Sequence, residues 1–543
     1  MCATFASLLL AGCDSSDKTA ATPAPVEIPM SALALPLCLD GHCGVVDQNA
    51  KVLLSFDNPY NNILPNGFKD SVFLAGDEHW SLASADGKTV HKADLGDTLI
   101  DLTPGFYGFM REGKYGVIDR NGVEVQPPQY DDIYPSSPAQ FIIFERDGLR
   151  GILDAQARPV TEALYSSSDV NIDPIRQGRL VMAERDEQPW LIDLDTHKQQ
   201  TVDFGALKER GDEHLVVTSP DHSHEGLADA HGTLLIPTRY HWLGTPAAGR
   251  VAFRERYDAP CGYLDYQGKV VIPAQFANCE PFGKQGALAQ EAKPDDSTGL
   301  YGFIDAQGQW KIPPTYDSAD KAGLTAMGFT QAVPGYSVIG KNDGPFKRHY
   351  GLFSTDEGKE LFAPTHALLG VIGQGLFAFS EDNSPQATIN LMGQTSNAPA
   401  IGVMDRQGHT LIAPSQFIEA SLDSSGRYLE LIDGIDWQAH TALYDLKGQQ
   451  VVAPKWMKLS IDPQRGYILA YSISGTAADQ VEDLEALFDL QGKPRFTVQE
   501  VACGASQLQD ANGKPVWPLD PQNHCPSSDA TEDSDTQEPP SDG

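Results

Sequence analysis

The chain has 543 residues, of which 41% are hydrophobic and 21% are charged, so most of it can bury a core. Asp and Glu outnumber Lys and Arg 74 to 39, which gives a formal net charge of -35. A surface this acidic repels phosphate backbones and anionic lipid headgroups, so we expect no nucleic-acid partner and no charge-driven attachment to a membrane.

The N-terminus carries a short apolar run, FASLLLAG, followed directly by Cys13. The run is too short to span a bilayer, and small residues before a cysteine are typical of a secretory cleavage site. Leu10-Ala11-Gly12-Cys13 resembles the lipobox of bacterial lipoproteins, which are cut before a cysteine that then receives a diacylglycerol. The resemblance implies a signal peptide over residues 1–12, lipidation of Cys13 and a cell-envelope location facing the periplasm. Asp14 resembles a signal for retention at the inner membrane.

Residues 13–37 are rich in Ala, Pro, Ser and Thr, and we interpret them as a flexible linker. Residues 38–525 then repeat one short pattern about twelve times, each copy built around a strand, an Asp-x-x-Gly turn and a second strand. A third strand, which begins with Gly, can be recognised further on in many copies. No stretch has the periodicity of a long helix, so the sequence predicts an all-β protein of about twelve three-stranded antiparallel units.

The recurring residues have structural explanations. The turn Asp can accept hydrogen bonds from backbone N–H groups two and three residues on, and the turn Gly supplies a positive φ. A Pro follows the second strand and is expected to end it, because Pro donates no ladder hydrogen bond. The clearest turn residues are Asp119, Gly122, Asp265, Gly268, Asp305, Gly308, Asp405, Gly408, Asp445 and Gly448.

Copies such as Tyr115-Gly-Val-Ile-Asp119 and Tyr301-Gly-Phe-Ile-Asp305 resemble the WG (KWG) repeat family. The resemblance implies a propeller-like ring or an open superhelical array, and the family has no known catalytic residues to transfer. The copies at Asp154 and Asp193 lack the turn Gly, which leaves two interpretations: irregular blades, or linkers between two sub-arrays.

Six cysteines lie within the array in three locally spaced pairs, which is typical of disulfides formed in an oxidising compartment. We predict the pairs Cys38–Cys43, Cys261–Cys279 and Cys503–Cys525. Residues 526–543 contain acidic residues but no Lys, Arg or aromatic residue, and we interpret them as a disordered acidic tail.

Other sites are weak in the sequence. His222 and His224 are the best candidates for metal ligands, but solvated loop histidines are the favoured interpretation, and we predict no metal site and no cofactor. A calcium site at the turn Asp residues is disfavoured because such sites need six or more converging oxygens. No nucleophile motif is present, so no catalytic residue is assigned and no enzyme activity is expected.

The sequence favours a non-catalytic envelope lipoprotein that acts as a binding or scaffold platform for an unknown protein or glycan. One alternative is an enzyme that acts on envelope polymers through carboxylates in a cleft. A second alternative is a cation-binding structural protein. Because the recurring residues build the frame, specificity is expected in the variable segments Asp221 to Glu225, Lys284 to Gly299 and Asp382 to Pro399.

Overall fold

The computed structural model covers the full chain and describes most of the repeat array. The described residues are 34–60, 62–65, 71–76, 79–136, 141–166, 180–293, 298–320, 335–344, 347–391, 394–435, 439–463, 466–474, 481–501 and 504–524. Cys13, the linker up to residue 33, Cys503, Cys525 and the acidic tail lie outside them. No helix in the described residues is long and apolar enough to cross a membrane.

The described residues form twelve antiparallel units, numbered here in chain order, and one short 3-10 helix. Units 1 to 4 contain β1 (Leu35–Leu39), β2 (His42–Val46), β3 (Val52–Leu54); β4 (Asn62–Pro65), β5 (Ser71–Ala75), β6 (Trp80–Ser84), β7 (Val90–Lys92); β8 (Leu99–Thr103), β9 (Phe106–Arg111), β10 (Lys114–Asp119), β11 (Glu124–Tyr130); β12 (Asp132–Pro135), β13 (Ile142–Arg146), β14 (Leu149–Leu153) and β15 (Tyr165–Ser166). Units 5 to 8 contain β16 (Leu180–Arg185), β17 (Gln188–Asp193), β18 (Gln199–Thr201); β19 (Ala206–Gly211), β20 (His214–Thr218), β21 (Glu225–Asp229), β22 (Leu234–Tyr240); β23 (Trp242–Leu243), β24 (Arg250–Arg254), β25 (Cys261–Asp265), β26 (Val270–Cys279); β27 (Ala287–Glu291), β28 (Tyr301–Ile304) and β29 (Trp310–Tyr316).

The last four units include an inserted hairpin and an extended final sheet. Units 9 and 10 contain β30 (Ser318–Asp320), β31 (Tyr336–Asn342), β32 (Arg348–Ser354), β33 (Lys359–His366); β34 (Leu368–Gly373), β35 (Leu376–Ser380), the hairpin β36 (Gln386–Leu391) and β37 (Gln394–Pro399), β38 (Gly402–Asp405) and β39 (Thr410–Ile412). Units 11 and 12 contain β40 (Glu419–Leu422), β41 (Tyr428–Ile432), β42 (Thr441–Asp445), β43 (Gln450–Trp456); β44 (Lys458–Asp462), β45 (Tyr467–Ser474), β46 (Val481–Asp489), β47 (Pro494–Glu500), β48 (Ser506–Asp510), β49 (Pro515–Trp517) and the 3-10 helix η4 (Pro521–His524).

The prediction of an all-β array of small antiparallel units is confirmed, but most units have four strands rather than three. The additional strand is the first of each unit, such as β12 or β30, and it is short and carries none of the recurring residues. Its position is set by pairing with the second strand, as in the register Ile133↔Phe144, so the sequence pattern alone does not mark it.

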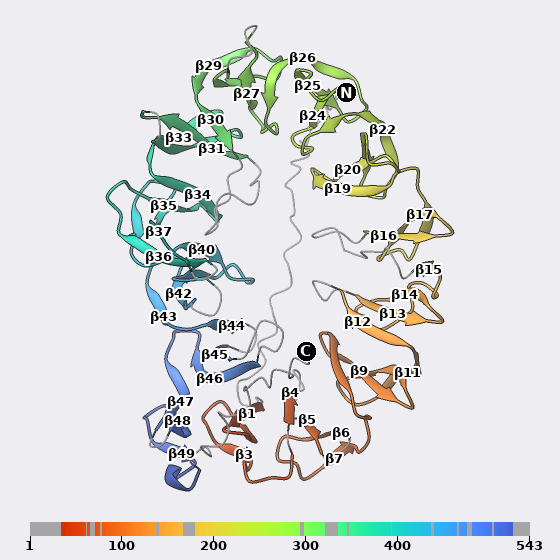
Figure 1. Cartoon of the computed structure of the whole chain (residues 1–543), viewed down its shortest axis with the longest axis vertical. Coiled ribbons are helices and arrows are strands. Elements are labelled where there is room, and N and C mark those ends of the chain that lie inside the picture. Colours follow the sequence, from red (N-terminus) through yellow and green to blue (C-terminus); the bar gives the residue numbers. More distant parts are fainter. Residues whose placement is uncertain are drawn as a thin grey trace, which may run out of the picture.

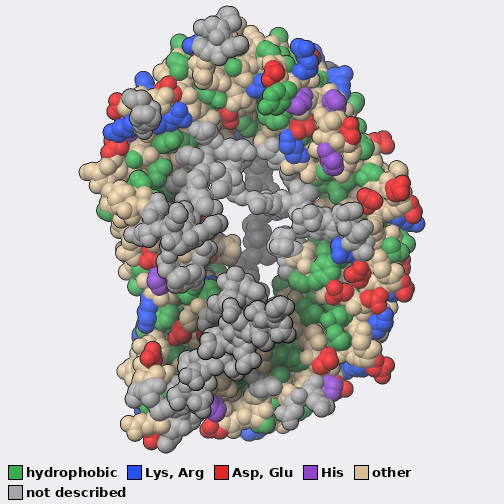
Figure 2. All heavy atoms as spheres, viewed as in Figure 1, with side chains coloured by type: hydrophobic (Ala, Val, Ile, Leu, Met, Phe, Trp, Pro, Cys, Tyr) green, Lys and Arg blue, Asp and Glu red, His purple; other side chains and the backbone are tan. Residues whose placement is uncertain are grey.

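The twelve units form a closed ring rather than an open superhelix. Figure 1 shows the first strands of the units toward the centre and the last strands at the outer rim, with β1 and β3 beside β47 to β49. One hydrophobic cluster joins Leu37 and Phe56 of unit 1 to Leu487 and Leu508 of unit 12. Figure 2 shows openings between the two sides of the ring, and acidic side chains gathered over units 3 to 5.

Ring closure depends on contacts between segments that are far apart in the sequence. The indole of Trp517 stacks on Phe56, with the ring centroids 4.6 Å apart, and also lies 5.6 Å from the ring of His42. The carboxylate of Asp40 accepts hydrogen bonds from the backbone N–H and the hydroxyl of Ser506, at 2.7 and 2.9 Å. These contacts bury the face that an open array would leave to solvent.

The prediction that Pro ends the outermost strand is wrong for most units. The strand passes through its Pro in β11, β22, β26, β29, β33 and β43. In unit 10, β39 ends at Ile412, before Pro414, as predicted. In unit 8, Tyr301 pairs with Tyr316 while Phe303 pairs with Ile312, so the outer strand bulges around Pro313. Pro is tolerated because an edge strand needs no donor on its outer side, and it also blocks pairing between rings. The bulge lies so close to Gly302 that a Cβ there would be 2.6 Å from the carbonyl oxygen of Ile312. This close approach explains the Gly that follows the aromatic residue in the repeat.

Candidate functional site

The Asp turns form one face of the ring, and their hydrogen bonds differ in one detail from the prediction. Asp119 Oδ1 accepts from the N–H groups of Asn121 at 2.8 Å and Val123 at 3.0 Å, which are two and four residues on. The N–H of Gly122, three residues on, donates to the backbone carbonyl of Asp119 instead. The same pattern recurs at Asp265, Asp305, Asp405, Asp445, Asp489 and Asp510. Asp510 adds a turn that the sequence pattern did not include.

The copies at Asp154 and Asp193, which lack the turn Gly, keep the same architecture. Ala157 adopts a φ of 57° in the turn after Asp154, and His197 adopts a φ of 56° in a turn after Asp193 that is one residue longer. Hydrophobic clusters continue from unit 4 to unit 5 and from unit 5 to unit 6. Units 4 and 5 therefore pack as members of the ring.

Several turns also contact the preceding unit, so the turn residues contribute to packing between units as well as to the turn itself. Side chains of one unit donate hydrogen bonds to carbonyl oxygens of the next unit's turn. These bonds run from Thr103 to Ala155 at 2.9 Å, Gln126 to Ala157 at 2.9 Å, Gln200 to His231 at 3.2 Å, Arg250 to Ala306 at 2.8 Å and Tyr428 to Leu490 at 3.0 Å. Among the described residues, no group of three or more His, Cys, Asp or Glu side chains is arranged to hold a metal ion.

Acid is expected to loosen these turns. Hydrogen bonds from the backbone N–H of Gln309 and Gln307 lower the pKa of the Asp305 carboxyl below 3.8, despite some desolvation. A lowered folded-state pKa stabilises the protein above the unfolded-state pKa, and this stabilisation is lost as the pH falls through the folded value. The melting temperature should therefore fall as the pH drops below about 4. Asp305→Asn keeps one acceptor oxygen but does not titrate. The protection of the Gln309 amide from exchange, relative to its intrinsic rate, should therefore no longer fall in acid. The same fall in protection in the parent and the variant would argue against this role.

The loops that connect the second and third strands of the four-stranded units, such as β9 and β10 in unit 3, lie at the opposite end of the sheets from the Asp turns, because neighbouring strands are antiparallel. Their lengths differ widely: two residues, Glu112 and Gly113, connect β9 to β10, whereas the hairpin β36–β37 interrupts unit 10. Two of the predicted variable segments, Asp221 to Glu225 and Asp382 to Pro399, occupy such loops. The third, Lys284 to Gly299, contains the whole of β27, whose Ala287, Leu288 and Ala289 are buried, so this part of the segment belongs to the frame and not to a variable loop.

The two candidate histidines lie in the loop of unit 6 and make local hydrogen bonds. The Nδ1 atom of His222 lies 3.1 Å from the hydroxyl of Thr218, and that of His224 lies 2.7 Å from the hydroxyl of Ser223. The same Ser223 hydroxyl donates to Asp221, and hydrogen bonds from Ser219 and Ser223 lower the pKa of that carboxyl to about 2. The cluster is exposed, and Asp221 contacts serines rather than an imidazole, so it does not form a catalytic triad.

Two of the three predicted disulfides are present. Cys38 is bonded to Cys43 in the hairpin β1–β2, and Cys261 is bonded to Cys279 across unit 7. The predicted pair Cys503–Cys525 lies outside the described residues.

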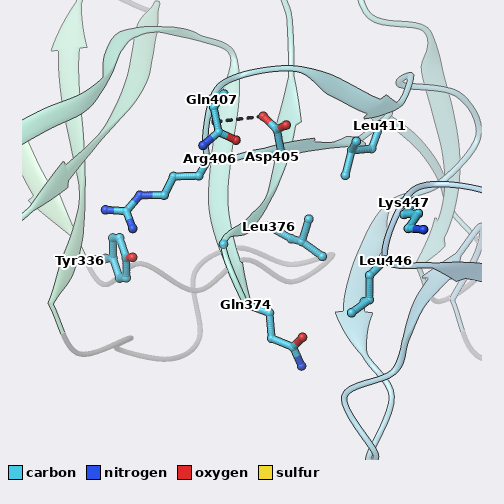
Figure 3. Close-up of a pocket in the computed structure, with 10 residues that line it drawn as sticks. Tyr336, Gln374, Leu376, Asp405, Arg406, Gln407, Leu411, Leu446 and Lys447 are labelled. Atoms are coloured by element: carbon cyan, nitrogen blue, oxygen red, sulfur yellow. Dashed lines mark hydrogen bonds between the residues drawn. The ribbon is translucent and has the colours of Figure 1, made fainter.

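A pocket of about 570 Å³ opens on the turn face where units 9, 10 and 11 meet. Tyr336 of unit 9 and Arg406 lie on one side of this junction pocket, and Lys447 of unit 11 lies on the other (Figure 3). Leu376 and Leu446 lie between them. The lining also includes Gln374, Gly375, Asp405, Gln407 and Leu411. The sequence-based reasoning missed this site because its residues come from three copies of the repeat, and the motif does not show how neighbouring copies pack together.

Comparisons with solved structures give only remote likenesses. The chain resembles a eukaryotic initiation factor (8% identity; 90% of this chain and 95% of the other; TM-score 0.31). It also resembles tricorn protease (10% identity; 83% and 56%; TM-score 0.29) and dipeptidyl peptidase 4 of Porphyromonas gingivalis (11% identity; 76% and 63%; TM-score 0.26). All three scores are low, so none of these likenesses carries an argument about function.

The sequence has no match among curated proteins. The model of the WG containing repeat matches residues 115–148, 262–290 and 301–321. Each matched stretch begins in the strand that precedes an Asp turn and ends in the next unit, so the sequence repeat is offset from the structural unit. Three stretches of the chain, beginning in units 3, 7 and 8, are therefore similar to the WG containing repeat.

Proposed function

We propose that the ring is a non-catalytic binding platform for a protein or glycan partner of the cell envelope. The observation that carries this proposal is the contrast between the frame and the loops. Turn Asp residues, turn Gly residues and the Gly opposite each bulge hold the units together, whereas the loops between second and third strands differ from unit to unit. Rigid repeats that present variable loops on one face are suited to recognition.

The hairpin β36–β37 of unit 10 offers a direct test. It packs through Ala387 and Ala400 on Ile418 of unit 11, at the outside of the frame. Replacing residues 386–399 by a two-residue turn, as in unit 3, should leave the ring folded and reduce recovery of partners from crosslinked envelopes. Shortening the loop 219–224 of unit 6 in the same way tests a second candidate recognition loop. If neither the intact chain nor the variants recover a reproducible partner, the platform proposal fails.

The same proposal includes attachment to the membrane by a lipid on Cys13. The two disulfides support an oxidising compartment, where such bonds persist. Cys13→Ser should move the protein from the membrane fraction to the soluble fraction, because lipid chains supply the membrane affinity. Cys2→Ser is the matched control and should leave fractionation unchanged. Membrane recovery of Cys13→Ser equal to that of the parent protein would refute lipidation at this residue.

A further inference from the structure

At the junction pocket, one residue of unit 10 is shorter than its equivalents in units 7, 9 and 11. In units 7 and 11, the first residue of the second strand pairs with the turn Asp, and its side chain reaches toward the turn of the next unit. Arg250, paired with Asp265, donates a hydrogen bond to the carbonyl oxygen of Ala306 at 2.8 Å. Tyr428, paired with Asp445, donates to Leu490 at 3.0 Å. These long side chains fill the junctions that follow units 7 and 11.

Unit 10 carries Leu376 at this position, paired with Asp405. Leu376 is buried against Leu411 and Leu446 and has no polar group to extend to the turn of unit 11. The space beyond it remains open and is bounded on its other side by Tyr336, which holds the equivalent position in unit 9. The pocket is therefore a vacancy at a position that neighbouring units fill.

The lining combines an apolar floor with a cationic and amide rim. Leu376, Leu411 and the ring of Tyr336 form the apolar part, and Gln374, Gln407, Arg406 and Lys447 supply polar groups. The carboxylate of Asp405 also lines the pocket, and its Oδ1 accepts hydrogen bonds from the N–H groups of Gln407 and His409 within the turn. Arg406 forms an ion pair with Glu357. Within the described part of the chain, the ammonium of Lys447 forms no ion pair. The ammonium of Lys447 supplies local positive charge at the rim, which favours an anionic group on the ligand, because salt screens the repulsion from the more distant acidic residues of the chain.

We propose that the junction pocket binds a carboxylated pyranose of an acidic saccharide. The C–H face of the sugar would lie on the ring of Tyr336 and the leucines, its hydroxyls would meet the amides of Gln374 and Gln407, and its carboxylate would pair with Lys447. A volume of about 570 Å³ is within the range of small-ligand sites. The polar groups of the rim are side chains rather than an open strand edge, which favours a sugar over an extended peptide. The pocket lies on the turn face and not at the variable loops, so this ligand site goes beyond the proposed platform function.

Direct titration of the full chain tests the proposal. Digalacturonate is the probe, and galactobiose is its uncharged counterpart; binding is followed by saturation-transfer NMR and calorimetry. Lys447→Gln places at this turn position the residue found at Gln267 and Gln307, so the fold should be kept. It should weaken digalacturonate binding about tenfold, as expected for the loss of a charge-assisted hydrogen bond, and leave galactobiose binding unchanged. Lys269→Gln, on the exposed turn of unit 7, is the charge-matched control.

A second variant tests the vacancy itself. Leu376→Tyr introduces the residue that unit 11 has at this position and should abolish binding of both sugars without lowering the melting temperature. Failure of the parent protein to bind digalacturonate, equal binding by Leu376→Tyr, or displacement of the sugar by an acidic peptide at lower concentration would overturn the proposal.

Discussion

Replacing Trp517 by Ala is expected to weaken ring closure by about 3 kcal/mol, the lower end of the cost of truncating a packed aromatic side chain. Trp517 stacks on Phe56 and contributes to the cluster that joins unit 12 to unit 1. Its loss would separate the two ends of the array without removing any repeat motif. Amide exchange in β1 and β48 should become about 100-fold faster, because both strands are protected by closure.

Trp310→Ala is the matched control for this prediction. Trp310 lies on the outer strand β29, is 37% exposed and contacts Phe276 at 5.5 Å between ring centroids. Its truncation should affect exchange only around units 7 and 8. If Trp517→Ala left exchange in β1 at the parent rate, Trp517 would not hold the ring closed.

Replacing Gly492 by Ala is expected to cost about 3 kcal/mol at the interface between units 11 and 12, from backbone strain and overpacking together. Gly492 has a φ of 77°, and a Cβ there would lie 1.9 Å from the carbonyl oxygen of Val451 in unit 11. The turn and the neighbouring backbone cannot both keep their positions. Exchange should therefore increase in β43 and β47, which border the interface.

Gly113 provides the comparison that separates strain from contact. It has a φ of 73°, close to that of Gly492, but a Cβ added there meets nothing within 4 Å. Gly113→Ala should cost only the left-handed backbone strain of about 1 to 2 kcal/mol. Equal effects of the two substitutions would show that the turns do not depend on packing against the preceding unit.

The Asp turns could be predicted from the sequence because the residues that form each turn lie within a single repeat. The turn at Asp119 and Gly122 needs only the residues that form it, so its Asp cap and positive φ follow from their types. The course of the outer strand through Pro313 could not be predicted in the same way. Tolerance of Pro depends on the strand being an edge strand, which is a property of the assembled sheet.

Closure and the junction pocket could not be predicted because they depend on residues far apart in the sequence. Nothing in the motif relates Phe56 to Trp517, or Asp40 to Ser506. A signal for the pocket was present, since Gly375-Leu376 aligns with Gly249-Arg250 as the start of a second strand. Its meaning depends on knowing that this side chain reaches toward the next turn.

Photo-crosslinking between the two ends of the chain tests the central claim, closure of the twelve units into a ring. Benzoylphenylalanine at position 42 replaces an exposed His whose ring lies 5.6 Å from that of Trp517. On irradiation of the monomer at low concentration, a closed ring predicts an intramolecular crosslink from position 42 to the segment Pro515–Trp517, identified by peptide mass spectrometry. Absence of that crosslink, or its formation only between molecules, would contradict the closed ring.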